Sequence, residues 1–159
     1  MTRPIIVVEC DNDELLLRLL KIPRSRIQHE GNRDEVVKYI NRNDPVRYIG
    51  MVDEDPGTPR SPNRARFVRK ELRNGVQEEV NGARRLVVLK PMLEGWLISA
   101  VHAAGGRMVH LDKGLSDVPS ELHRQLMPRG DKRMKKVIEF LDGRKSAHLK
   151  SLRSALHIG

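Results

Sequence analysis

The sequence predicts an α/β fold: a small four-stranded parallel sheet flanked by helices, followed by a basic helical C-terminal extension. Three observations predict it. Short apolar, β-branched runs alternate with amphipathic segments, the connections between them are short, and the character becomes basic and helical after Gly105 and Gly106. Strands and helices that alternate in this way form parallel crossovers, so helices are expected on both faces of the sheet. We place the α/β core at residues 1–112 and the extension, packed on that core, at 113–159.

Each element has a local signal. Asp11 is expected to cap the first helix, which follows the apolar run IIVV and ends before Pro23. Asn32 is expected to cap the second helix, and Ser61 with Pro62 to begin a third. The strands are predicted at 4–9, 26–29, 46–52 and 85–89. The later helices are predicted at 33–43, 65–73, 92–104, 120–126, 132–141 and 147–156.

Composition bounds the class of protein. The chain has 159 residues, enough for one domain with a hydrophobic core, and no apolar run approaches the roughly 20 residues of a membrane span. Its formal net charge is +9, and residues 128–159 carry nine basic and three acidic residues. A basic region beside an acidic one fits a protein that acts on nucleic acid. The single cysteine and the absence of a signal-peptide pattern predict a cytoplasmic protein.

Acidic residues follow two of the predicted strands. Glu9 ends the first strand and Asp53 follows the third, so the two carboxylates meet at one sheet edge if these strands are neighbours. Asp55 points the same way as Asp53 in an extended segment, whereas Glu54 points away. Asp13 lies in the first turns of the helix after Glu9. Crowded carboxylates repel one another, and a divalent cation relieves that repulsion, so we expect one or two Mg²⁺ or Mn²⁺ ions here.

The order of these motifs resembles the Toprim domain of topoisomerases, primases and certain nucleases. The likeness covers about residues 4–100 and depends on IIVVE, on Asp13 and on YIGMVDED. It implies that Glu9, Asp53 and Asp55 are the catalytic residues. Glu9 is then the acid/base residue or a ligand of a second ion, and Asp53 and Asp55 bind the metal, with Asp13 as an additional acidic member. Many Toprim sequences place glycine after the glutamate, whereas this chain has Cys10.

The segment KPMLEGWL, at residues 90–97, adds a second likeness. It is similar to a Pro-x-x-Glu-x-Trp segment of small Toprim-like proteins in defence systems, including relatives of the overcoming-lysogenization-defect nucleases. That likeness implies that Glu94 is a further metal-site carboxylate. A negative charge in the first turn of a helix is also favourable by itself, so the two interpretations of Glu94 stay open.

The leading function is a metal-dependent nuclease, or a related phosphoryl-transfer protein, acting on DNA or RNA. A ribosomal-RNA maturase of the Toprim class is a narrower alternative. The non-enzymatic alternative is a Mg²⁺-binding regulatory or partner subunit, because the chain lacks a phosphate-binding loop of its own while Toprim parts often work beside an ATPase. The partners considered are therefore nucleic acid, an ATPase or other protein, and a second copy of the chain. The residues predicted to contact nucleic acid are Lys132, Arg133, Lys135 and Lys136.

Overall fold

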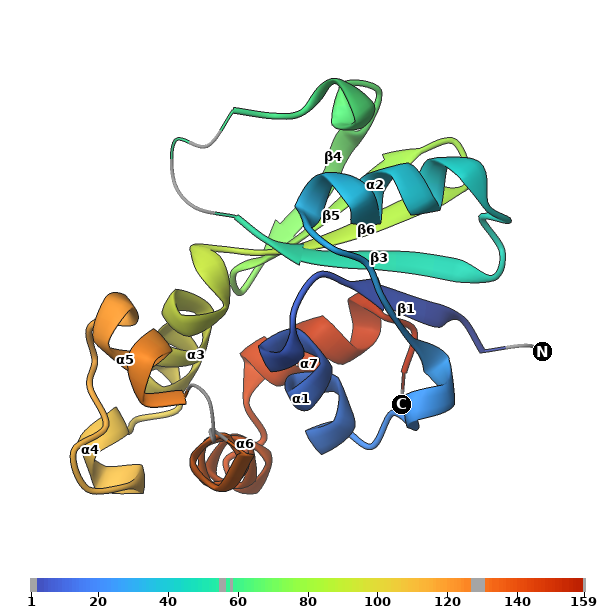
Figure 1. Ribbon diagram of the computed structural model, residues 1–159. Coiled ribbons are helices and arrows are strands. Elements are labelled where there is room, and N and C mark those ends of the chain that lie inside the picture. The colour runs from blue at the N-terminus through green and yellow to red at the C-terminus, as the bar shows by residue number, and fades with distance from the viewer. Residues whose placement is uncertain (1–2, 55–56, 58, 127–130, 159) are drawn as a thin grey trace.

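The computed structural model describes residues 3–54, 57, 59–126 and 131–158, which form a mixed sheet with helices on both faces (Figure 1). The sheet has six strands in the order β2-β1-β3-β6-β5-β4. Strands β2, β1, β3 and β6 run parallel, and β6, β5 and β4 are antiparallel. In chain order the strands are β1 (Ile5–Val8), β2 (Ile27–His29), β3 (Tyr48–Asp53), β4 (Val68–Arg73), β5 (Val76–Asn81) and β6 (Arg84–Leu89).

The four parallel strands are those that the sequence predicts. Their apolar residues alternate between the two faces, as a sheet covered on both sides requires. One face of these strands joins a cluster with α1 and α3, and the opposite face joins a smaller cluster with α2. Thus Ile6 and Val8 belong to the larger cluster, whereas Val7 belongs to the smaller one.

The helix predicted over residues 65–73 is wrong. A short 3₁₀ turn, η2 (Pro62–Arg64), follows Ser61 with Pro62 at its first position as expected, but the chain then continues as strand β4. Asn74 and Gly75 both have positive φ, at 51° and 70°, and close a tight hairpin between β4 and β5. Cross-strand pairing therefore prevails over the helical character of this charged segment.

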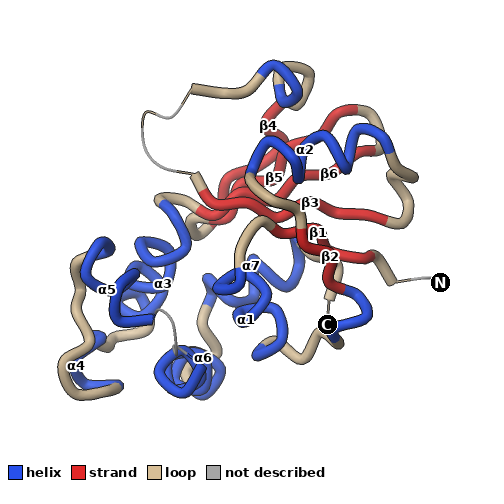
Figure 2. The backbone as a smooth tube through the Cα atoms, viewed as in Figure 1, coloured by secondary structure: helices blue, strands red, loops and turns tan. Residues whose placement is uncertain are grey.

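The helices cover the sheet in two layers (Figure 2). Helix α2 and η2 lie on one face, and the remaining long helices lie on the other. Asn32 caps α2 by accepting a hydrogen bond from the Glu35 N–H at 2.9 Å, as predicted, but Asp11 is the first residue of α1 rather than its cap. The helices are α1 (Asp11–Leu19), η1 (Arg24–Arg26), α2 (Arg33–Arg42), α3 (Met92–Ala103), α4 (Met108–Leu111), α5 (Pro119–Leu126), α6 (Asp131–Gly143) and α7 (Ala147–Ala155).

The C-terminal helices share the larger hydrophobic cluster with the strands. Leu122 of α5, Val137 of α6 and Leu152 of α7 are buried in the same cluster as Val8 and Leu16. Apolar packing thus continues across residue 112. Within the part of the chain described, no helix combines the length and apolar character needed to cross a membrane.

Candidate metal and phosphoryl-transfer site

The strand pairing brings the first two predicted site residues to one edge of the sheet. Strands β1 and β3 are parallel neighbours, with Ile5 opposite Tyr48, so Glu9 after β1 and Asp53 at the end of β3 lie at the same carboxyl edge. Burial, followed by hydrogen bonding to Asp53 and repulsion from its charge, raises the pKa of Glu9 to about 7. The backbone and positive charge of Arg33 oppose that rise. The two carboxylates therefore lie close enough for each to affect the charge of the other.

Asp13 lies in the first turns of α1 and is fully buried. Neither of its carboxylate oxygens has a hydrogen-bond partner among the described residues. Burial and repulsion from Asp53 raise its pKa to about 8, and the charges of Glu9 and Glu94 act in the same direction. A buried carboxyl group without a partner is costly when charged, so this side chain needs either a proton or a cation.

Helix α3 supplies the remaining contacts of the cluster. The Leu93 backbone N–H donates to Oδ2 of Asp53 at 3.0 Å, so the positive end of the helix dipole faces that carboxylate. Glu94, in the same first turn, is 2% exposed. Its Oε1 lies 2.7 Å from Nδ1 of His123 on α5. Neither the Leu93 N–H nor His123 had a signal in the sequence, because both contacts depend on tertiary packing.

Asp55, predicted as a metal ligand and catalytic residue, lies outside the described residues. Its neighbour Glu54 turns away from Asp53, as the extended geometry predicts. Glu54 forms ion pairs with Arg64 at 3.4 Å and with Lys90 at 3.5 Å. Arg64 in turn forms a buried pair with Glu79. Asp53 therefore faces the acidic cluster, whereas Glu54 faces basic side chains on the other side of the chain.

Four carboxylates, from Glu9, Asp13, Asp53 and Glu94, thus lie in one electrostatically coupled cluster. In the described residues, however, no three of them present ligand atoms that all lie within 4.8 Å of one another. Their donor set still fits a hard cation, since it is made of oxygen alone and includes a buried orphan carboxylate. A bound Mg²⁺ would keep several waters and take only one or two of these carboxylates.

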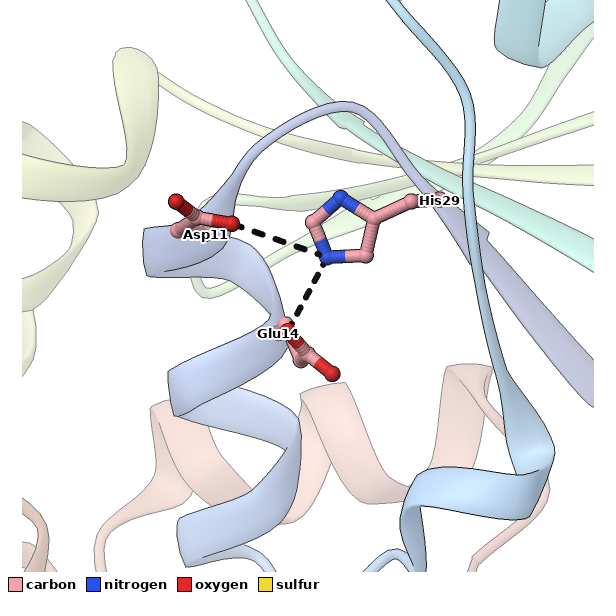
Figure 3. Close-up of side chains that lie close together, drawn as sticks. All are labelled: Asp11, Glu14 and His29. Carbon is pink, nitrogen blue, oxygen red and sulfur yellow. Dashed lines mark hydrogen bonds and ion pairs between the residues drawn. The ribbon is translucent and has the colours of Figure 1, made fainter.

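A different set does meet that distance, and the sequence did not predict it. It comprises Asp11, Glu14 and His29 (Figure 3). His29 Nε2 lies 3.1 Å from Glu14 and 4.0 Å from Asp11, and Arg24 also pairs with Glu14. The Asp11 side chain is wholly exposed. Ordinary ion pairing accounts for this arrangement, and exposed acidic groups of this kind are common without a metal.

The predicted nucleic-acid contacts lie on α6, which packs on the outer side of α1 and α3 (Figure 1). Arg133 and Lys136 both pair with Asp112, at 3.4 and 3.1 Å. Lys135 lies 3.9 Å from Glu139, and Lys132 is exposed. Pairing with Asp112 weakens the positive field that these side chains present to a polyanion.

Comparisons of the chain with protein-family models, curated proteins and solved structures find no match.

Proposed function

We propose that the protein is a Mg²⁺- or Mn²⁺-dependent nuclease, or a related phosphoryl-transfer protein, that acts on DNA or RNA through a Toprim-like acidic cluster. The observation that supports this most is the fully buried, unpartnered carboxylate of Asp13 beside Glu9, Asp53 and Glu94. A purely structural core would avoid such a group, because burial and the neighbouring acidic side chains both oppose its charge. A cation at the cluster would compensate it.

The residues have distinct roles in this proposal. Asp53, at the strand end, and Asp55 are the metal ligands, with Asp13 and Glu94 as supporting acidic groups. Glu9 has a pKa of about 7 and is the member suited to exchange a proton near neutral pH. The bound ion would supply charge stabilisation for the attacking and leaving oxygens of a phosphodiester.

A regulatory or partner subunit is the second candidate, and a specific observation favours it. Three of the four described carboxylates already have contacts within the protein. Glu94 contacts His123, and Asp53 accepts a hydrogen bond from the Leu93 N–H and lies near Arg33. Glu9 lies close to Asp53. Such a cluster is able to hold one structural ion without catalysis, with an ATPase or other partner supplying activity. A ribosomal-RNA maturase differs from the leading proposal in its substrate, not in its site.

Cleavage assays separate these proposals. Wild type, Asp53→Ala and Glu9→Gln are incubated with Mg²⁺ or Mn²⁺ and a panel of ribosomal precursor RNA, duplex DNA and single strands. The control is Glu139→Gln, which removes an exposed charge on α6. We expect cleavage by wild type and the control alone. Equal cleavage by all four proteins would contradict the enzymatic proposal, and Mn²⁺ binding without cleavage would favour the regulatory subunit.

A further inference from the structure

Arg33, the first residue of α2, lies beside the acidic cluster, and its buried side-chain Nε has no hydrogen-bond partner among the described residues. Its Nη2 is 3.9 Å from Oδ1 of Asp53, and the two side chains are 26% and 21% exposed. That distance is beyond the 2.7–3.2 Å of an N–H···O hydrogen bond, so the pair is electrostatic only. This contrasts with the forked, two-bond geometry that arginine usually forms with a carboxylate.

The backbone holds Arg33 at this place. Asn32 caps α2, so the helix begins at Arg33 and directs its positive N-terminal end toward the sheet edge. Burial raises the pKa of Glu9, whereas the charge and backbone of Arg33 act to lower it. Arg33 therefore lies close to Glu9, which directly follows β1, and to Asp53, the last residue of β3.

Other basic side chains near this edge are already engaged. Lys90 and Arg64 pair with Glu54, and Arg64 also forms a buried pair with Glu79. Arg33, in contrast, contacts a member of the cluster itself and keeps donors that have found no acceptor in the described part of the chain. It is thus the described basic side chain best placed to meet a substrate held at the cluster.

We propose that Arg33 is a phosphate-binding residue of this site, an inference that rests on the proposed function. In the metal-free protein its guanidinium partly neutralises Asp53. With a divalent cation held at Asp53, the Arg33 guanidinium would lose this partner and would be free to donate to a phosphate oxygen of the nucleic acid. The planar fork of arginine matches a phosphate in two-bond geometry, and a lysine does not reproduce that match.

Two binding measurements test this without relying on cleavage. The first titrates Mn²⁺ alone into the protein by calorimetry. The second measures fluorescence anisotropy of labelled duplex DNA and labelled single-stranded RNA in Ca²⁺. Both compare wild type with Arg33→Gln, Arg33→Lys and Arg42→Gln. Arg42 is the matched control, because it is an exposed arginine at the other end of the same helix. Circular dichroism verifies that each variant is folded.

We expect Arg33→Gln to weaken nucleic-acid binding by about tenfold or more, as loss of a charge-assisted hydrogen bond does. We expect Mn²⁺ affinity to stay equal or to increase, because a competing cation is gone. Arg33→Lys should fall between wild type and Arg33→Gln, and Arg42→Gln should bind nearly as wild type. Equal nucleic-acid binding by Arg33→Gln and Arg42→Gln, or weaker Mn²⁺ binding by Arg33→Gln, would overturn the phosphate-binding role of Arg33 but not the proposed function. Absence of Mn²⁺ binding by wild type would overturn the proposed function as well.

Discussion

Nδ1 of His123 lies 2.7 Å from Oε1 of Glu94, and this contact joins the C-terminal helices to the acidic edge of the sheet. Glu94 is on α3, directly after the strand that follows the hairpin, whereas His123 is on α5. The carboxylate is 3% exposed and the imidazole is half-exposed. The buried acid is therefore satisfied by a residue from beyond the predicted α/β boundary at residue 112.

Replacing His123 with alanine should leave the Glu94 carboxylate buried without its imidazole partner. We expect His123→Ala to lower the free energy of unfolding by about 1–3 kcal/mol, the cost of an unsatisfied buried acceptor. Urea denaturation measures this change. His110→Ala is the matched control, because His110 is an exposed histidine on α4. Equal losses in the two variants would mean that the contact to Glu94 does not stabilise the fold.

The acidic cluster should make the metal-free protein less stable as pH rises. The folded-state pKa of Asp13 is about 8 and that of Glu9 about 7, against ordinary values of 3.8 and 4.5. The unfolded chain therefore releases protons that the folded protein retains. The stability from these groups is fully present below about pH 4 and is lost as pH rises to about 8.

Asp13→Asn tests this dependence, since the amide cannot ionise. In EDTA we expect the stability advantage of Asp13→Asn over wild type to be about 4 kcal/mol larger at pH 8 than at pH 5, since each pH unit between the two pKa values is worth about 1.4 kcal/mol. Urea denaturation at the two pH values measures both quantities. Asp11 is an exposed residue in the same helical turn, so Asp11→Asn should have nearly the stability of wild type at both pH values. A wild-type stability that is flat between pH 5 and 8 would contradict the prediction.

Divalent cations should reverse that loss of stability. An ion that binds only the folded state stabilises it by about 2.7 kcal/mol at a concentration 100 times its Kd. We expect Mn²⁺ to raise the Tm of wild type but not of Asp53→Asn. The rise should be larger at pH 8 than at pH 6, because protons on Glu9 and Asp13 compete with the ion. Scanning calorimetry measures the shifts, and Glu139→Gln serves as the charge control.

Strands β1, β3 and β6 could be predicted because each contains an apolar run that is buried on both faces, a pattern that charged surface segments do not have. The β4–β5 hairpin was missed because β4 is almost wholly exposed, so its residues show no alternation. The signal that would have found it is Asn74–Gly75, the pair typical of a two-residue hairpin turn.

Some residues of the candidate site could be placed from the sequence and others could not. Glu9 and Asp53 could be placed from the sequence because residues at the ends of neighbouring parallel strands meet at one edge. Arg33 and His123 could not be placed, because their contacts depend on how α2 and α5 pack against that edge. A single sequence does not reveal such packing. The preference of Glu54 for the opposite side was predictable from the two-residue period of an extended chain.

The ion pair between Arg64 and Glu79 provides the last prediction. Both side chains are buried, at 3% and 1% exposure, and Arg60 and Gln77 also donate to Glu79. Burial alone would raise the pKa of Glu79, but the hydrogen bonds and charge of Arg64 outweigh it and hold that pKa below its ordinary value. Arg64 therefore keeps a charged carboxylate inside the protein.

Arg64→Met should lower the free energy of unfolding by about 3 kcal/mol or more, because it removes a buried cation from beside Glu79 and leaves that carboxylate charged in the interior with the half-exposed Arg60 as its ion-pair partner among the described residues. Arg66→Met, two residues away and exposed, should change stability little. Urea denaturation at pH 7 compares the two variants. If the carboxylate is the cause, adding Glu79→Gln to Arg64→Met should restore part of the loss, whereas additive losses would show that packing of the Arg64 side chain, rather than its charge, stabilises this part of the sheet.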